Sequence, residues 1–514
     1  MIQRFFLNRV NGKSRVIAIG IEDNFVIFIL SDITKSALIF GKQAASRTDF
    51  ALNFIINNLL IFHKMYYNIF MPKIKEPSVS GMFYPSDREV LEKQINNFAQ
   101  NIAESEYKSR AVIVPHAGLV YSGQLAFEGI NSLKRDIKNL FIFAPAHRVA
   151  FEGLSLSGFD EWKTPIGNIE LNQTVNRELE EKFNAKIFDE AFREEHSVEI
   201  QLPIVQTIFK DVKIIPVLVG RENPEKITEI ISEYYPNQDF GFIISSDLSH
   251  FLTDEQAKQI DGKTAEMIES GDIQNFSYEQ ACGAVGIYGL VQFANKNNYS
   301  LIRVNMYNSS LVTDDKSRVV GYGSWMLYEG TKNRFIKEYY SEYSLKLCRD
   351  VIEARLNGSK IITDHPTVFE SEGACFVTLK KHGHLRGCIG SIIAHRSLII
   401  DLLHNAQNAA FSDPRFNPVS KDEIKDLTID ISLLSTPKQM KFQDEADFMN
   451  QIVPFKDGII IKDGHFQAVY LPSVWEEIPD KETFIRTLKM KAGLPPNHFS
   501  KTFEAFRFET EYIT

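Results

Sequence analysis

The chain has few cysteines, no CxxC pair and no excess of basic residues. Its 514 residues include four cysteines, too few and too scattered to suggest a disulfide framework or a four-cysteine zinc site. Basic residues number 57 against 66 acidic ones, a formal net charge of −9. That balance argues against a general nucleic-acid-binding protein.

The chain also lacks a long apolar run. The longest candidate, residues 54–62, is interrupted by Asn57 and Asn58 and falls short of the roughly 20 apolar residues that a membrane span needs. Hydrophobic residues make up 44% and charged residues 24%, the composition of a folded protein rather than a disordered one. At roughly 100–200 residues per domain, the length predicts two to four domains. We therefore expect a cytoplasmic protein that binds neither membrane nor nucleic acid.

Residues 1–70 differ from the rest of the chain. They contain no proline, are rich in Phe, Ile and Asn, and show apolar runs without sustained periodicity. The segments of a secretory signal do not occur there in the required order. We expect an N-terminal extension without packed structure, for which a mis-set start codon is one explanation. A small docking segment is the alternative.

Residues 72–329 contain four short apolar runs separated by stretches of helical periodicity. Such runs are typical of parallel strands that are buried on both faces of a sheet, and their alternation with helices indicates βα units. We predict an α/β domain with a largely parallel or mixed central sheet and flanking helices. The runs are residues 111–114, 140–143, 214–219 and 242–244.

Three of these four runs are followed closely by a histidine: His116, His147 and His250. In open α/β sheets, ligands bind just beyond the carboxyl ends of the strands. Three unrelated loop histidines are the alternative, but their repeated placement favours a shared site. Asp247 precedes His250 by three residues, so the two share a face if a helix starts there. A carboxylate beside an imidazole suits His250 to proton transfer.

Two further residues are candidates for the same site. His196 lies among carboxylates at the head of an apolar helix, and Cys282 opens another apolar segment. Neutral imidazole and thiolate are good ligands for iron, copper or zinc. A site with two histidines and one cysteine leaves coordination positions open for a substrate. A buried, inert thiol is the alternative for Cys282.

The motifs of this region together resemble the Memo family over about residues 78–329. The matching segments are Gly81-Met-Phe-Tyr-Pro85, Pro115-His-Ala-Gly-Leu-Val-Tyr-Ser-Gly123, Pro145-Ala-His147, Thr164-Pro-Ile-Gly167, Glu195-His-Ser-Val-Glu199, Ser245-Ser-Asp-Leu-Ser-His250 and Ala281-Cys-Gly283. That family is similar to the class III extradiol dioxygenases, which are non-heme iron enzymes, so the resemblance implies a LigB-like fold. Two departures are Ala146, where serine is common, and the lack of a proline after Gly283.

The resemblance implies a metal held by His116, His147 and Cys282. Iron is the first expectation, with copper or zinc as alternatives. The same resemblance places His250 at the base position of the dioxygenases, with Asp247 and His196 lining the pocket. Because the dioxygenases have a carboxylate where Cys282 stands, ring cleavage does not transfer directly to this chain, and the substrate is an unknown small molecule.

Residues 334–514 have the pattern of a second, α+β domain. Residues 427–433 alternate between apolar and polar, which marks a half-buried strand. Asp463-Gly464 stands between two apolar runs and predicts a hairpin. Residues 343–356 and 398–410 have helical patterns. Hairpins mixed with helices indicate an antiparallel sheet with helices packed on it.

Cys388 is the chemical candidate of this second domain. Arg386 stands two residues before it and could stabilise a thiolate, and the flanking glycines would let a substrate come close. A tight turn with a small buried cysteine is the alternative, and a solvated hairpin tip or an anion site is expected at residues 380–384.

This half resembles the AMMECR1 family over nearly all of residues 334–514. The matching segments are Phe376-Val-Thr-Leu379, Leu385-Arg-Gly-Cys-Ile-Gly390, Ala409-Ala-Phe-Ser-Asp-Pro-Arg-Phe416, Ile431-Ser-Leu-Leu-Ser435, Gly458-Ile-Ile-Ile461, Leu471-Pro472 and Lys491-Ala-Gly493. The family's biochemical activity is not established. A Memo domain joined to an AMMECR1 domain resembles two components of the prokaryotic AmmeMemoRadiSam system, which implies a radical SAM protein as a partner.

Three functions are consistent with these residues. The first is a metal-dependent redox enzyme with His250 moving protons. The second is a metal-binding scaffold or chaperone for the radical SAM partner, without turnover. The third is a hydrolase that uses Cys282 with His250 and Asp247. Two further converging histidines would be superfluous to a Cys-His pair, which favours the first two.

Overall fold

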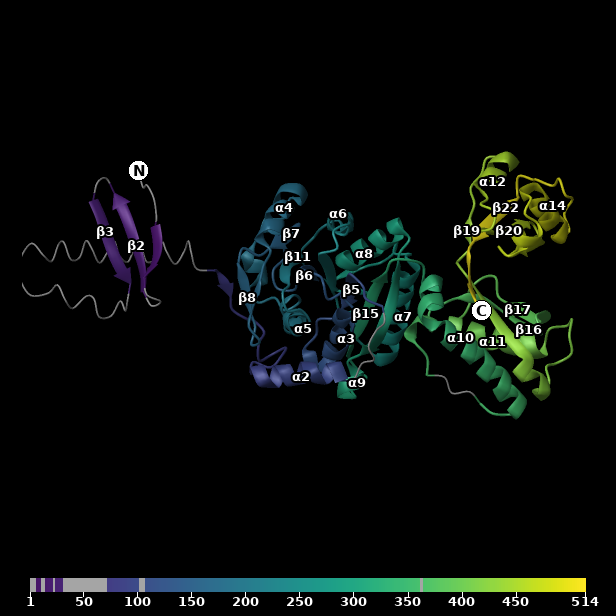
Figure 1. The fold of residues 1–514 in the computed structure, drawn as a ribbon, viewed down its shortest axis with the longest axis horizontal. Coiled ribbons are helices and arrows are strands. Elements are labelled where there is room, and N and C mark those ends of the chain that lie inside the picture. Colours follow the sequence, from purple (N-terminus) through teal and green to yellow (C-terminus); the bar gives the residue numbers. More distant parts are fainter. Residues whose placement is uncertain (1–5, 11–13, 22–23, 31–71, 101–106, 361–363) are drawn as a thin grey trace, which may run out of the picture. The chain divides into compact units, whose positions relative to one another are not determined.

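The computed structural model describes residues 72–100, 107–360 and 364–514, together with the backbone of three strands near the N-terminus (Figure 1). It divides into two units, Met1–Pro72 and Lys73–Thr514. In the first unit, β1 (Phe6–Val10), β2 (Ser14–Ile21) and β3 (Asn24–Leu30) form an antiparallel sheet. The rest of the predicted extension, and the packing of its side chains, lies outside the described residues.

A nine-stranded sheet organises the first large domain. Its order is β10-β7-β11-β6-β12-β5-β15-β13, with β14 paired to β15. The strands are β5 (Ala111–Val114), β6 (Asn139–Pro145), β7 (Leu154–Leu156), β10 (Lys186–Ile187), β11 (Lys213–Val219), β12 (Phe240–Ser245), β13 (His250–Leu252), β14 (Ser300–Asn308) and β15 (Val319–Tyr328). Strands β11, β6, β12 and β5 are parallel, whereas β7 runs antiparallel to β11 and β15 runs antiparallel to β5. These four parallel strands are the four apolar runs, so the predicted mixed α/β sheet is confirmed.

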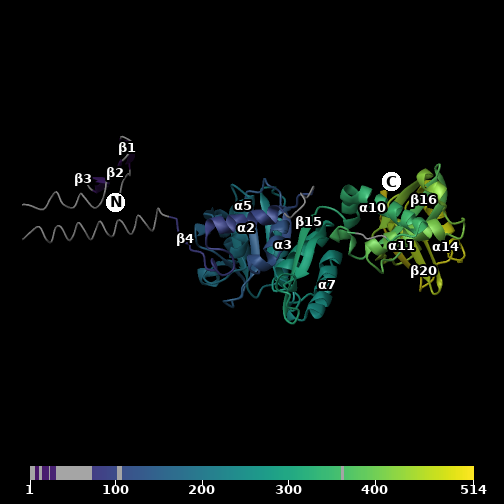
Figure 2. The same ribbon diagram turned by 90° about the horizontal axis from the view of Figure 1, so that it is seen from below.

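Successive residues of the central strands enter two different apolar cores. Val112 and Ile142 pack with α2 (Arg88–Gln100), α3 (Leu119–Asn131) and α5 (Leu202–Ile208), which lie on one face (Figure 2). Ile113 and Phe143 belong to the core of the opposite face. Because both faces are covered, the strands are apolar throughout rather than alternating. The helices of that opposite face are α4 (Gln173–Phe183), α6 (Pro224–Tyr234), α7 (Asp254–Ser270) and α8 (Ala284–Asn297).

A short N-terminal segment closes the first domain. Strand β4 (Ile74–Lys75) pairs with β8 (Glu161–Lys163), which pairs with β9 (Asn168–Glu170). Residues 73–84 then run past a single turn of 3-10 helix at Glu199–Gln201, immediately before α5. Buried Glu199 binds this segment, which matters for the site described below.

Two four-stranded antiparallel sheets make up the second domain. One has the order β17-β16-β18-β23 and the other β19-β22-β20-β21. The predicted α+β domain with an antiparallel sheet is thereby confirmed, as is the hairpin at Asp463-Gly464. The strands are β16 (Ala374–Lys381), β17 (His384–Gly390), β18 (Leu427–Leu434), β23 (Thr510–Ile513), β19 (Lys438–Gln439), β20 (Gly458–Asp463), β21 (Phe466–Tyr470) and β22 (Glu504–Phe508).

Helices cover one face of each of these sheets (Figure 1). The first sheet packs against α10 (Lys332–Asn357) and α11 (Leu398–Phe411). The second packs against α12 (Glu445–Gln451), α13 (Val474–Glu477) and α14 (Lys481–Lys491). Among the residues that the structure describes, no helix combines the length and apolar character required to cross a bilayer.

Candidate metal site

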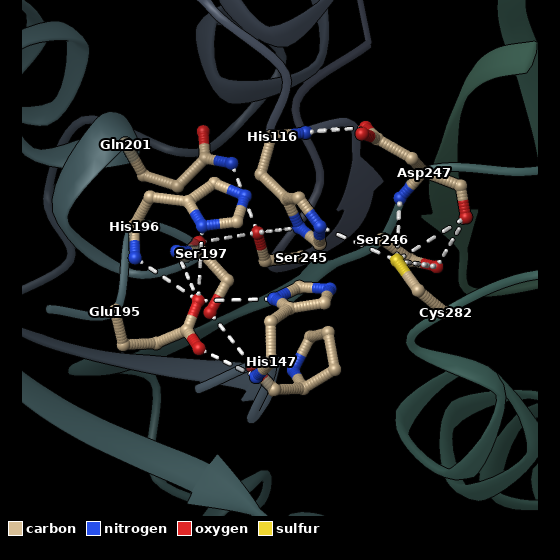
Figure 3. Close-up of polar contacts among 11 residues, drawn as sticks. His116, His147, Glu195, His196, Ser197, Gln201, Ser245, Ser246, Asp247 and Cys282 are labelled. Atoms are coloured by element: carbon tan, nitrogen blue, oxygen red, sulfur yellow. Dashed lines mark hydrogen bonds and ion pairs between the residues drawn. The ribbon is translucent and has the colours of Figure 1, made fainter. Parts of the chain in front are cut away.

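Five predicted site residues meet at the carboxyl edge of the large sheet (Figure 3). His116, His147 and Asp247 stand in the loops that follow β5, β6 and β12, which are neighbours in the sheet. His196 precedes the 3-10 turn, and Cys282 lies just before α8. The parallel arrangement of the strands brings the first three together. The other two arrive from elements that pack over this edge.

The three imidazoles form a compact group, here called the histidine cluster, of His116, His147 and His196. One coordinating atom of each residue lies within 4.8 Å of those of the other two. The ring centroids are 4.9–5.4 Å apart. The thiol of Cys282 lies beside the cluster, with Sγ 3.3 Å from Nε2 of His116. Nitrogen and sulfur donors at this spacing could converge on a single ion after small side-chain adjustments.

Glu195 orients two of these histidines, and sequence analysis gave it no role. Its Oε1 accepts a hydrogen bond from Nδ1 of His147 at 3.0 Å, and its Oε2 accepts one from the backbone N–H of His147. Oε1 also accepts the backbone N–H groups of His196 and Ser197. Burial alone would raise the pKa of Glu195, but the hydrogen bonds from His147 and His196 hold this pKa well below its usual value. Because an ionised carboxylate can only accept hydrogen bonds, Glu195 fixes the ring proton of His147 on Nδ1. Nε2 of His147 is then unprotonated and free to coordinate a metal.

Ser245 fixes the ring proton of His116 on Nδ1 in a similar way. The single hydroxyl proton of Ser245 is donated to the carbonyl oxygen of Ser197, and the same Oγ accepts a hydrogen bond from Nε2 of Gln201. Nδ1 of His116 lies 3.0 Å from this Oγ and must be its second donor. Nε2 of His116 is therefore unprotonated, so it can coordinate a metal, and it faces Cys282. Burial and the nearby His147 and His196 lower the pKa of His116 well below its usual value, so this ring is neutral, as a metal ligand must be.

The thiol of Cys282 is held by the loop after β12. The backbone N–H of Asp247 donates to Sγ at 3.3 Å, and the N–H of Cys282 donates to the carbonyl oxygen of Asp247. Burial, followed by the negative charge of Asp247, raises the pKa of Cys282 above its usual value. Without a cation, the residue is a neutral thiol, and a bound metal would release its proton.

The absence of a side chain at Gly283 allows the backbone next to Cys282 to pack closely against Ser245 and Ser246. A Cβ at that position would lie 2.6 Å from Cβ of Ser246 and 2.8 Å from the carbonyl oxygen of Ser245. We expect Gly283→Ala to lower the free energy of unfolding by about 1–3 kcal/mol, because backbone must move to accept the methyl group. Denaturant unfolding measures the change, and Gly262→Ala, at an open helical position, is the matched control. Equal stability of the two variants would contradict the close approach.

A cavity of about 840 Å³ opens beside the cluster. His147 and Cys282 line it, as do the exposed Arg221 and Tyr278. Most of the remaining wall is apolar, including Val149, Phe151, Val219 and Val285. A cavity of this size and character is typical of a small-molecule site.

Asp247 and His250 are not arranged as the helical spacing suggested. Residues 246–249 are not helical, and His250 begins strand β13, which pairs with β15. The expectation of a shared helix face is therefore wrong. Asp247 instead accepts the backbone N–H of His116 at 2.7 Å and fixes the loop that carries it. Burial raises the pKa of Asp247, and the hydrogen bond from the backbone N–H of His116 and the charge of His250 oppose that rise.

Cys388 lies in the second domain, on the edge strand β17. Its Sγ accepts a hydrogen bond from the hydroxyl of Thr378 at 3.3 Å. Asp413 accepts its backbone N–H, and Arg415 donates to its carbonyl oxygen. The side chain of Arg386, two residues earlier, is engaged by Glu423 through two hydrogen bonds of 3.1 Å.

The ion pair between Arg386 and Glu423 predicts an acid-sensitive contribution to stability. Hydrogen bonding from Arg386 lowers the pKa of Glu423 from 4.5 to about 2. Because the folded value is the lower one, the pair stabilises fully above about pH 4.5, and this stabilisation is lost as the pH falls towards 2. The difference in unfolding free energy between the wild type and Glu423→Gln should therefore shrink from about pH 6 to about pH 3. A constant difference over that range would contradict the assignment.

The fold and this set of donors define an α/β domain with a mixed sheet and a candidate metal centre, followed by an α+β domain. Comparison with known proteins gives the families: a Memo-like protein model matches residues 75–326, and an AMMECR1 model matches residues 345–513. The chain belongs to the MEMO1 family and carries an AMMECR1 domain in the same polypeptide.

Two individual relatives bear the MEMO1 family name, in agreement with this assignment. A MEMO1 family protein from Thermoplasma volcanium is 32% identical over 261 residues, which is 49% of this chain and 97% of the relative. A MEMO1 family protein from Aquifex aeolicus is 28% identical over 261 residues, again 49% of this chain and 97% of the relative. A crystal structure of an uncharacterised protein from Pyrococcus horikoshii is 30% identical and covers 34% of this chain and 89% of its own, with a TM-score of 0.32.

Proposed function

We propose that the Memo-like domain holds a divalent first-row metal on His116, His147 and Cys282 and performs redox chemistry on a small molecule in the adjoining cavity. Iron is the metal we expect first, and copper or zinc would suit the same donors. One observation carries the proposal: hydrogen bonds on Nδ1 of both histidines leave each Nε2 free to coordinate a metal, Nε2 of His116 lies 3.3 Å from the thiol of Cys282, and His147 and Cys282 line the cavity.

The donor set fits the metal. Both imidazoles have their proton on the nitrogen that faces the protein, and the thiol already receives a backbone N–H that would stabilise its ionised form. When bound, iron would supply a Lewis acid and a one-electron redox centre. Asp247 positions the loop of His116, His250 moves protons near the site, and the apolar cavity walls exclude water from the substrate.

Metal analysis of anaerobically purified protein tests the proposal. We expect close to one iron per chain in the wild type, oxygen uptake with a suitable substrate, and loss of both on chelation. Cys282→Ser should weaken retention of the metal, whereas Cys388→Ser, in the other domain, should leave it unchanged. A wild type that holds no metal even after reconstitution with Fe(II), Cu(II) and Zn(II) would overturn the proposal.

A second candidate is a metal-binding scaffold for a radical SAM partner. The presence of both family domains in one chain favours it, because fusion keeps two components of a shared task together. A scaffold should hold the metal at full occupancy and show no oxygen uptake with any substrate that the cavity binds. The burial that raises the pKa of Cys282 disfavours the third candidate, a metal-free hydrolase, because such an enzyme needs a thiolate.

A further inference from the structure

We infer that the Memo-like domain carries a docking surface for the AMMECR1 domain and that the first half of helix α10 is the element it recognises. The two domains then form one unit instead of two bodies on a flexible tether. The surface, here called the docking face, consists of Tyr107, Glu269, Arg303 and Tyr328. The inference goes beyond the proposed function, because it does not depend on whether a metal is bound.

Helix α10 is kinked, and its first half belongs to neither matched family region. Tyr340 has φ of −134° and ψ of 21°, which interrupts the helix. The first half, residues 332–339, falls between the region that the Memo model matches, which ends at residue 326, and the region that the AMMECR1 model matches, which begins at residue 345. This half-helix is therefore a joining element, and its contacts on its two sides show what it joins.

Aromatic side chains fix the half-helix to the first domain. The ring of Phe335 packs edge-on against Tyr107 and Tyr328, with centroids 5.8 and 5.1 Å apart. Tyr107 and Tyr328 belong to the first domain, and the hydroxyl of Tyr107 donates to the carbonyl oxygen of Leu327. The hydroxyl of Tyr328 in turn donates to Glu338 of the half-helix at 2.6 Å. Phe335 is only 3% exposed, and a buried aromatic anchor of this kind is typical of the centre of an interface.

The AMMECR1 domain holds the same half-helix from its other side. Nζ of Lys337 pairs with Glu511 of strand β23 at 2.8 Å. Nζ of Lys332 donates to the hydroxyl of Ser371 and to the carbonyl oxygen of Glu372. The half-helix is thus fixed to the second domain and presents Phe335 to the first.

Arg303 makes a second, independent contact between the domains. Its guanidinium lies between a carboxylate of each domain, with Nε 2.6 Å from Glu269 and Nη1 2.9 Å from Glu370. The hydroxyl of Thr367, in the second domain, donates to the carbonyl oxygen of Arg303 at 2.8 Å. The side chain of Arg303 is 9% exposed, so separating the domains would take Glu370 away from a largely buried charge.

Apolar packing connects these two sets of contacts. Ile302 and Met326 of the first domain belong to the same buried cluster as Ile336 of the half-helix and Phe369 of the second domain. Domains of one chain commonly move relative to each other, unless the interface between them is extensive and apolar. Only residues 329–331 separate β15 from α10, which is too short a connection to carry the half-helix to a second copy of the chain. The partner of the docking face is therefore the AMMECR1 domain of the same chain.

Cleavage of the full-length chain at the junction tests the inference. A recognition site for a specific protease, inserted between Gly330 and Thr331, is cut after purification, and gel filtration with light scattering over a dilution series measures the association of the two fragments. We expect them to elute together, at the mass of one chain, at micromolar concentration. Phe335→Ala should weaken the association by roughly 30-fold or more, because it removes the aromatic anchor. Glu370→Gln, at a half-exposed position, should weaken it by roughly 5-fold.

Lys346→Ala is the matched control. Lys346 is exposed on the second half of α10 and pairs with Asp350 of the same helix, so its loss should leave the association unchanged. Fragments of the wild type that separate at micromolar concentration would show two tethered bodies and overturn the inference. Elution at twice the mass of one chain would place the half-helix on a second copy and overturn the arrangement within one chain.

The role of the half-helix has its own test. An association unchanged by Phe335→Ala, in protein whose circular dichroism matches that of the wild type, would overturn that role. If Phe335→Ala does not fold, Glu370→Gln decides, since an unchanged association there would remove Arg303 from the docking face. The metal content of the fragments does not enter these results, so failure of the proposed function would leave them as they are.

Discussion

Replacement of His116 by alanine is expected to remove nearly all of the bound metal while the fold persists. The residue supplies the most buried donor, and its Nε2 is the nitrogen that lies 3.3 Å from the thiol of Cys282. Losing this donor should lower metal affinity by more than the roughly 100-fold that loss of a supporting residue can cause. Metal content after gel filtration measures the effect, and circular dichroism and thermal unfolding check the fold.

The fold should survive this substitution because the links that build the site remain. Asp247 binds the backbone N–H of residue 116, which alanine keeps. Ser245 keeps its bonds to Ser197 and Gln201 when the imidazole is gone. His147→Ala should lose the metal in the same way, whereas Cys388→Ser should retain it. Stoichiometric metal in His116→Ala would contradict the ligand assignment and would leave the Cys282 thiol as the reactive group to examine.

The strands of the first domain could be predicted because their signal is local. Each of the four parallel strands is a short apolar run, since both faces are buried, and the residues after a run must emerge at the sheet edge. That logic places His116 and His147 together without any knowledge of tertiary contacts. In the second domain, a hairpin and a strand could be predicted for the same reason, from the Asp463-Gly464 turn and from the alternation of residues 427–433.

The role of Glu195 could not be predicted from the sequence, although the neighbouring His196 was expected to line the pocket. Glu195 stands in an irregular segment between two 3-10 turns, so no periodicity shows which side chains of this segment point inwards. Glu194 and Glu195 are chemically identical neighbours, yet the first is exposed and the second is buried. Only packing of this segment against the loop of His147 distinguishes them. The position of Glu195 directly before a histidine was the one available signal.

The wrong expectation at Asp247 and His250 has a related cause. A spacing of three is compatible with a helix, but the residues after Ser249 pair with β15 instead. Phe251 adopts a left-handed backbone conformation with φ of 62°, which a helix cannot include. Pairing between segments distant in the sequence thus overrides the local pattern.

Glu199 is expected to be the residue of the first domain whose loss destabilises the protein most. Its buried carboxylate accepts hydrogen bonds from Nζ of Lys75, the backbone of Ser78 and Val79, and the hydroxyl of Tyr84. Burial and this carboxylate raise the pKa of Tyr84 above its usual value, so the phenol remains a donor. Glu199→Ala leaves the Lys75 ammonium buried without its partner, and we expect a loss of about 3–5 kcal/mol in unfolding free energy.

The same substitution should reach the metal site through the segment that Glu199 binds. Phe83, next to Tyr84, covers the ring of His196 at 4.5 Å, so a loosened segment uncovers that histidine. Metal affinity should therefore fall together with stability in Glu199→Ala, while the exposed Glu194→Ala should change neither. Denaturant unfolding and competition binding on both variants measure the two effects. A large loss of stability with unchanged metal affinity would show that residues 73–84 support the fold alone and that the cover over His196 has no part in holding the ion.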